Sequence, residues 1–91
     1  MSNKRYSITI EYCVPWNYLP YTARAVEEIL GNYQHVVDDL KLITGSKGVF
    51  DVKVNGELIY SKHQTGRHTK EGEVLELFTN FVGSDVPRYG K

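Results

Sequence analysis

The pair Asn55-Gly56 constrains the fold of this 91-residue chain more than any other feature of its sequence. Apolar and polar residues alternate before it, from Val49 to Val54, and the pattern of a strand resumes after it, from Glu57 to Ser61. Asn-Gly suits a two-residue turn in which both residues take a positive φ. We therefore predict an antiparallel hairpin with strands at 49–54 and 57–61.

The first half of the chain changes its hydrophobic period twice. Residues 5–12 alternate in the manner of a half-buried strand, and residues 16–33 then follow a helical period that stops near Gly31-Asn32. Residues 36–43 alternate again and predict a second strand. The apolar stripe expected on the helix comprises Leu19, Ala23, Val26, Leu30 and Tyr33, widened by Ala25 and Ile29.

The last third of the chain predicts a loop, a helix and a tail. Residues 62–69 are polar and basic and are expected to form a loop. A helix should run from Lys70 to Val82, with Thr69 as its N-cap and Gly83 as its stop. We expect one domain over residues 1–83 and a flexible tail over residues 84–91.

These elements give the order βαβββα, and connection rules then select a topology. The helix at 16–33 joins two parallel strands, and the hairpin adds an antiparallel pair. The simplest sheet has strands in the order 2-1-3-4, numbered along the chain. Every strand carries polar residues on one face, so both helices should cover the other face. The predicted fold class is a two-layer α/β sandwich.

Composition narrows the function classes. Eleven Lys and Arg balance eleven Asp and Glu, so no basic excess favours nucleic acid. A single cysteine excludes an internal disulfide and suits a reducing compartment, so we expect a cytoplasmic location. The sequence contains no apolar run long enough to predict a membrane-spanning helix. The charged open face of the sheet predicts a monomer.

The predicted topology places Cys13, the only cysteine, at the sheet edge where several chain segments meet. A cysteine just before a helix lies near unpaired N–H groups and the positive end of the helix dipole, which favour thiolate over thiol. The alternative is that a lone cysteine is a small buried hydrophobe. The loops at 44–48 and 62–69 bring cations to the same edge: Lys47, Lys62, His63, Arg67 and His68. Two histidines in an irregular loop, without ligands at metal-binding spacing, do not predict a metal site.

Several motifs resemble the Rdx family of selenoprotein W-, T- and H-like proteins. The similarity runs from about Tyr6 to Phe81 and is most specific over Gly45–Lys62, where a glycine precedes Phe50 and the hairpin ends in Ser-Lys. The resemblance implies a thioredoxin-like fold and thiol redox chemistry at a Cys-x-x-Cys or Cys-x-x-selenocysteine motif. Cys13 matches the first position of that motif, and Trp16 occupies the second.

This departure limits the chemistry that the resemblance implies. Without a second thiol, dithiol disulfide reduction is not expected, and release of a mixed disulfide needs an outside thiol. We expect one-thiol exchange or redox sensing at Cys13, with glutathione or a protein thiol as partner and no bound cofactor. Lys47, Lys62 and Arg67 would pair with glutathione carboxylates. The alternative is a non-catalytic module that binds a protein through the Cys13–Trp16 edge, with Tyr12, Pro15 and Tyr18 extending an aromatic patch around Trp16.

Overall fold

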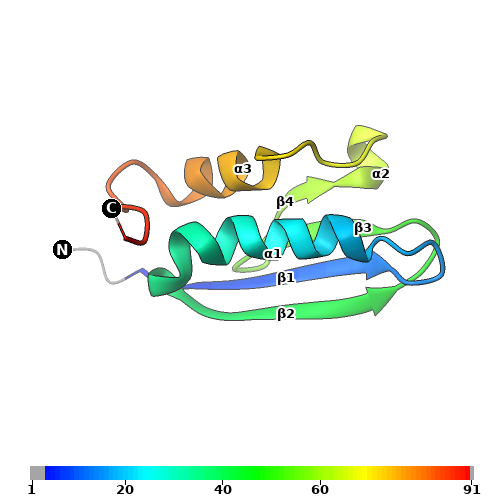
Figure 1. Cartoon of the computed structure of the whole chain (residues 1–91), viewed down its shortest axis with the longest axis horizontal. Helices are drawn as coiled ribbons and strands as arrows, with labels where there is room; N and C mark the ends of the chain where they lie inside the picture. The colour runs from blue at the N-terminus through cyan, green and yellow to red at the C-terminus, as the bar shows by residue number, and fades with distance from the viewer. Residues whose placement is uncertain (1–3, 91) are drawn as a thin grey trace.

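A computed structural model describes residues 4–90 of the chain (Figure 1). The elements follow in the order β1 (Tyr6–Cys13), α1 (Leu19–Tyr33), a short 3-10 helix η1 (Gln34–Val36), β2 (Val37–Gly45), β3 (Phe50–Val54), β4 (Glu57–Ser61), α2 (Lys62–Thr65) and α3 (Glu73–Val82).

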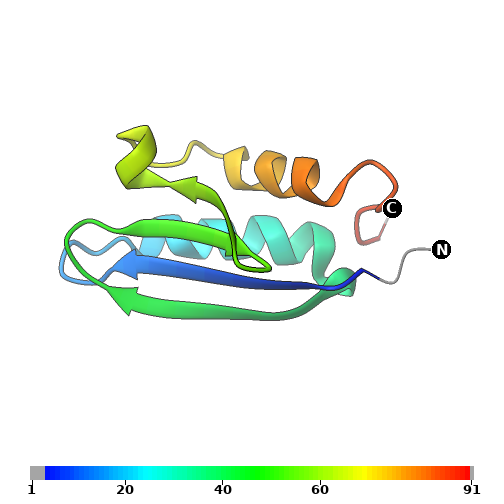
Figure 2. The same ribbon diagram turned by 180° about the vertical axis from the view of Figure 1, so that it is seen from behind.

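The four strands form one mixed sheet in the order β2-β1-β3-β4. β1 pairs in parallel with β2 and antiparallel with β3, and β3 pairs antiparallel with β4. Both long helices lie on one side of the sheet, as the views from its two faces show (Figures 1 and 2). The predicted two-layer fold and strand order are confirmed. The hairpin is also confirmed, with positive φ at Asn55 (51°) and Gly56 (83°).

The hydrophobic core lies between the sheet and the two long helices. Alternation along β1 and β3 delivers Ile8, Ile10, Phe50, Val52 and Val54 to it, all without exposed surface. The buried residues of α1 are Thr22, Ala25, Ile29 and Tyr33. The buried face of α1 therefore differs from the predicted apolar stripe, because Leu19 is 49% exposed and Ala23 is exposed as well.

The start of α1 explains this difference. We predicted a helix from Trp16, but residues 14–17 form a turn and α1 begins at Leu19. The turn is closed by N–H groups of Asn17 and Tyr18, which donate to the carbonyls of Val14 (2.9 Å) and Cys13 (3.0 Å). Because the turn sets where the helix begins, it also sets which side of α1 faces the sheet. The predicted end of the helix near Tyr33 is confirmed, and Gly31-Asn32 lie within its last turn.

The segment predicted as a loop over residues 62–69 contains the short helix α2. The Ser61 hydroxyl accepts a hydrogen bond from the Gln64 N–H, and Gly66 ends the turn with φ 78°. The start predicted for the last helix was also wrong, because α3 begins at Glu73 after Gly72, whose φ is 81°. Thr69 does not cap α3 and is instead buried. The predicted stop at Gly83 is confirmed, with φ 94°.

The C-terminal segment returns to the end of α1. The Tyr89 N–H donates to the Asn32 carbonyl at 2.7 Å, and His35 Nε2 lies 2.9 Å from the Pro87 carbonyl oxygen. Val86 packs against the core. The flexibility predicted for residues 84–91 stays a prediction, and Lys91 lies outside the described residues. Over residues 4–90, no helix has the length and apolar character needed to cross a bilayer.

Candidate functional site

Cys13 is the last residue of β1, and its side chain has no exposed surface. Its N–H donates to the Val49 carbonyl at 2.9 Å, and its own carbonyl accepts from the Tyr18 N–H at 3.0 Å. The next N–H, of Val14, donates to the Gly45 carbonyl at 3.0 Å. The backbone around Cys13 is thus hydrogen-bonded to the last residue of β2, to the residue before β3 and to the turn that follows. A reagent reaches this thiol only when that turn or a covering side chain moves.

The helix-dipole argument for a reactive Cys13 does not hold in this fold. Five residues, Val14 to Tyr18, separate Cys13 from the first residue of α1. The field of a helix terminus falls off within its first turn, so a thiol this far back gains little from it. The predicted proximity to the helix start was wrong because residues 14–17 form a separate turn.

Trp16 covers the glycine of the opposite loop. A Cβ placed on Gly48 would lie 2.6 Å from Cζ3 of Trp16, so only a residue without a side chain allows this contact. Gly48 also needs its positive φ of 76°. The indole is 61% exposed, and neighbouring Val14 is 48% exposed. Trp16 therefore forms an apolar, solvent-facing edge beside the buried thiol.

Behind this edge lies a cluster of rings, which we call the Tyr18 cluster (Tyr18, Tyr21 and His68). The His68 imidazole stacks on Tyr21 with ring centres 3.7 Å apart and planes 4° from parallel. His68 and Tyr18 form a T-shaped pair with ring centres 4.3 Å apart, and Tyr18 and Trp16 form another with ring centres 6.2 Å apart. The Lys62 ammonium lies 5.6 Å from the centre of the Tyr18 ring. A continuous row of rings thus connects Trp16 to the loop before α3.

His68 is held in its neutral form by this packing. Burial lowers the pKa of the imidazole below 6.5, and the nearby charges of Lys62 and Arg24 lower it further. The Nδ1 atom is buried and has no hydrogen-bond partner among residues 4–90. His68 is therefore an aromatic packing residue with one unsatisfied nitrogen.

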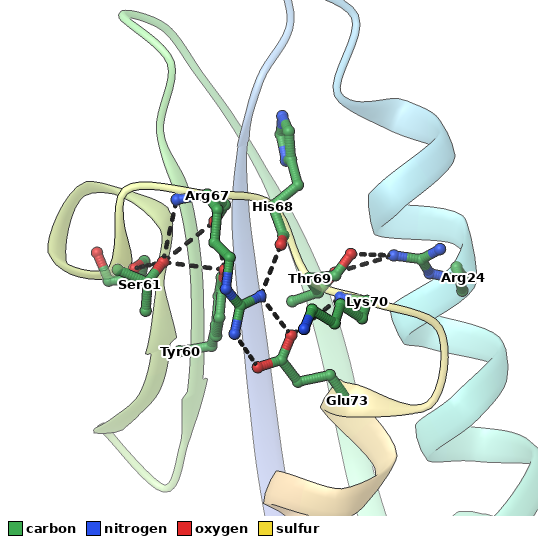
Figure 3. A network of polar contacts seen from close by, with 9 residues as sticks. Arg24, Tyr60, Ser61, Arg67, His68, Thr69, Lys70 and Glu73 are labelled. Carbon is green, nitrogen blue, oxygen red and sulfur yellow. Dashed lines mark hydrogen bonds and ion pairs between the residues drawn. The ribbon is translucent and has the colours of Figure 1, made fainter.

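Arg67 is engaged by Glu73, as the close view of the loop shows (Figure 3). Two nitrogens of the guanidinium donate to the two carboxylate oxygens at 2.8 and 2.7 Å. The same carboxylate accepts the Lys70 N–H at 2.9 Å. The hydrogen bond from Arg67 lowers the pKa of Glu73 to about 2, and the Lys70 N–H contributes. Because Glu73 already neutralises its charge, Arg67 attracts a carboxylate of a ligand less strongly than an unpaired arginine would.

Further hydrogen bonds fix the rest of this loop. The Arg24 guanidinium donates to the carbonyl of buried Thr69, and the Tyr60 hydroxyl donates to the Arg67 carbonyl. Arg67 also donates to the His68 carbonyl at 2.9 Å. These bonds, drawn in Figure 3, hold His68 in the Tyr18 cluster.

The structure brings most of the predicted site residues to one end of the sheet. Trp16, Tyr18, His68 and Lys62 are linked by ring contacts, and exposed Lys47 lies next to Gly48 beneath Trp16. Pro15 is exposed in the turn. Arg67 is paired with Glu73, and His63 is exposed on α2.

Sequence reasoning missed several residues of this region: Tyr21, Arg24, Gly48 and Glu73. A signal existed only for Gly48, as the glycine before a strand. Within residues 4–90, no three His, Cys, Asp or Glu side chains come close enough together to hold a metal ion.

Comparisons with known sequences identify proteins that are similar to this chain. The model of the Rdx family matches residues 7–80. The chain is 27% identical over 85 residues to migration and invasion enhancer 1 of Bos taurus, a match that covers 80% of this chain and 72% of that protein. The protein of the same name in Mus musculus is 26% identical over 69 residues, covering 76% of this chain and 58% of the relative.

Solved structures share the fold. A selenoprotein W-related protein from Vibrio cholerae superimposes with a TM-score of 0.80 at 20% identity, over 88% of this chain and 100% of that chain. A protein from Bordetella parapertussis superimposes with a TM-score of 0.78 at 21% identity, over 85% and 98% of the two chains. At such low sequence identity these matches show only that the fold is shared.

Proposed function

Because this chain belongs to the Rdx family, we propose that it is a thioredoxin-like redox protein that works with one thiol, that of Cys13. The observation that carries the proposal is the position of this residue. Cys13 ends β1 and begins the turn toward α1, the place where the family has the first cysteine of its motif, and Trp16 occupies the second position. A thiol without a partner thiol supports exchange with an external thiol and not dithiol reduction.

The reaction that fits one thiol is glutathione-dependent exchange. The Cys13 thiolate attacks the glutathione sulfur of a glutathionylated protein, a new disulfide forms between Cys13 and glutathione, and the protein leaves as a thiolate. A second glutathione thiolate then attacks the glutathione sulfur on Cys13. Oxidised glutathione leaves and the Cys13 thiolate returns, so the two electrons come from the two glutathione molecules. The cytoplasm, which keeps glutathione reduced, would suit this cycle.

Access and charge define what the site residues would do in this cycle. The Cys13 side chain has no exposed surface, so attack requires the 14–17 turn or a side chain that covers the thiol to move. Lys62, beside Tyr18, and exposed Lys47 are the cations left to meet the carboxylates of glutathione. Arg67 would contribute less, because its charge is already paired with Glu73.

Intact-mass measurement after incubation with oxidised glutathione tests the proposal. The native protein should gain one glutathione, lose it on addition of reduced glutathione, and remain unmodified as Cys13→Ser. The same incubation in strong denaturant shows that the thiol is intrinsically reactive. An adduct that forms in denaturant and never on the native protein would contradict the proposal.

One observation favours a second function, that of a protein-binding module. Trp16 is 61% exposed and Val14 is 48% exposed, whereas the neighbouring thiol is buried. Large aromatic side chains anchor protein interfaces. The partner would then be a protein with an apolar contact surface. Affinity capture compared among wild type, Trp16→Ser and Cys13→Ser distinguishes the two functions. A partner that requires Trp16 and binds Cys13→Ser as well as wild type indicates the module, whereas one that requires Cys13 indicates exchange.

A further inference from the structure

β2 is a nine-residue strand at the border of the sheet, and only one of its edges is paired. Over the described residues its one ladder is that with β1. Figures 1 and 2 both show β2 at the margin, with no element beyond it. Open strand edges present N–H and C=O groups that can pair with another chain.

The hydrogen bonds of β2 define which residues face outward. The Gly45 carbonyl accepts the Val14 N–H, so the polar backbone groups of Gly45 point toward β1. Backbone direction alternates along a strand, so those of Lys41 and Asp39 also point toward β1. The N–H and C=O of Leu40 and Leu42 therefore point outward, where a second strand would pair with them.

Two charged residues of β2, Asp39 and Lys41, are left without an ion pair among residues 4–90. They lie two positions apart on the open face of the sheet, and both are exposed. The adjacent Asp38 is not available in the same way, because its carboxylate accepts from Arg5 at 2.8 Å. Charges on a strand edge usually prevent pairing with other chains. Here a partner strand must place a positive charge opposite Asp39 and a negative charge opposite Lys41, and other strands are disfavoured.

We propose that the open edge of β2 pairs antiparallel with β2 of a second copy of this chain, centred on Leu40. A two-fold axis through this residue makes Leu40 face Leu40 of the other copy as a hydrogen-bonded pair. The same axis places Asp39 of each copy opposite Lys41 of the other. Residues opposite one another without shared hydrogen bonds have their side chains closest, which suits an ion pair. β2 is thus complementary in charge to an antiparallel copy of itself.

Apolar side chains support the same register. Leu40 is half-buried and Leu42 is 44% exposed, both on the helix side of the sheet. In the dimer, Leu42 of each copy lies diagonal to Leu40 of the other, so the four leucines form one patch. Leu42 also lies directly opposite Asp38 of the other copy, whose charge is paired with Arg5. Asp39 and Lys41 belong to the charged open face that predicts a monomer, and exposed ion pairs contribute little to binding. We therefore expect a weak dimer that forms at high concentration and dissociates on dilution.

Sedimentation velocity over a range of protein concentrations tests this inference, together with two charge variants. Wild type should show a concentration-dependent dimer. Asp39→Lys alone and Lys41→Asp alone should each weaken self-association by about tenfold or more, because like charges then face each other twice in the dimer. Mixing the two variants should restore a dimer. One chain then carries lysine at both positions and the other carries aspartate at both, so opposite charges face each other again.

Each possible outcome decides the matter. A wild type that stays monomeric at millimolar concentration overturns the proposal, and so does a dimer that both variants leave unchanged. A mixture that remains monomeric, when each variant is folded by circular dichroism, overturns the proposed register. None of these results depends on Cys13, so they are separate from the tests of thiol exchange.

Discussion

Replacing Glu73 by Gln tests whether the Arg67–Glu73 pair organises the loop beside the site. The carboxylate accepts two hydrogen bonds from Arg67, at 2.8 and 2.7 Å, and one from the Lys70 N–H at 2.9 Å. Gln keeps the size of the side chain but removes its charge. We expect the variant to fold with a lower free energy of unfolding and a more mobile 66–72 loop.

The magnitude follows from the pKa of Glu73. A fall from 4.5 to about 2 corresponds to a stabilisation of at most about 3.5 kcal/mol, at about 1.4 kcal/mol per pH unit. The pair is partly solvated, because the Arg67 side chain is 45% exposed and the Glu73 side chain 21% exposed. Solvent screening reduces the contribution to about 1 kcal/mol.

The pH dependence distinguishes this contribution from a general loss of packing. Since folding lowers the pKa of Glu73, its contribution is present above pH 4.5 and is lost as the pH falls toward 2. Urea unfolding of wild type and Glu73→Gln should therefore differ by about 1 kcal/mol at pH 7 and converge near pH 2. A difference that stays the same at both pH values, or no difference at pH 7, would refute the reasoning.

Two further predictions concern the residues around the thiol. Gly48→Ala should lower the free energy of unfolding by about 1–3 kcal/mol and change the fluorescence emission of Trp16, because the new Cβ would clash with the indole and the backbone φ is 76°. As a control, Gly31→Ala, where a Cβ meets no neighbouring atom, should stabilise the protein by a few tenths to about 1 kcal/mol. Equal effects of the two substitutions on stability would count against the contact between Gly48 and Trp16. His68→Phe should weaken the loss of stability as the pH falls below 6.5, because the native imidazole resists protonation and the unfolded one does not; melting curves from pH 7.5 to 5 that coincide in shape would contradict this.

The sheet could be predicted from the sequence because its signals are local. Asn55-Gly56 fixes the hairpin, and alternation along β1 and β3 fixes which residues are buried. Connection rules then leave one simple strand order. The beginning of α1 could not be predicted in the same way. Trp16 and Leu19 fit a helical period, but the hydrogen bonds of the 14–17 turn take precedence, and both side chains stay exposed.

The candidate site was predicted in position but not in detail. Topology correctly gathered Trp16, Tyr18, Lys62 and His68 at one end of the sheet. Pairing between charged side chains depends on loop geometry, so nothing in the sequence indicated that Glu73 engages Arg67. The burial of Cys13 was among the alternatives left open, and only the packing of the folded chain decides it.

The most direct test of one-thiol chemistry in the folded protein is the reactivity of Cys13 at low urea. The rate of reaction with an aromatic disulfide such as Ellman's reagent is measured well below the unfolding transition. If the 14–17 turn opens locally, the rate should be nearly independent of urea, because local opening exposes little surface. A rate that rises with the full urea dependence of global unfolding would mean that only the unfolded chain reacts, and would contradict the account.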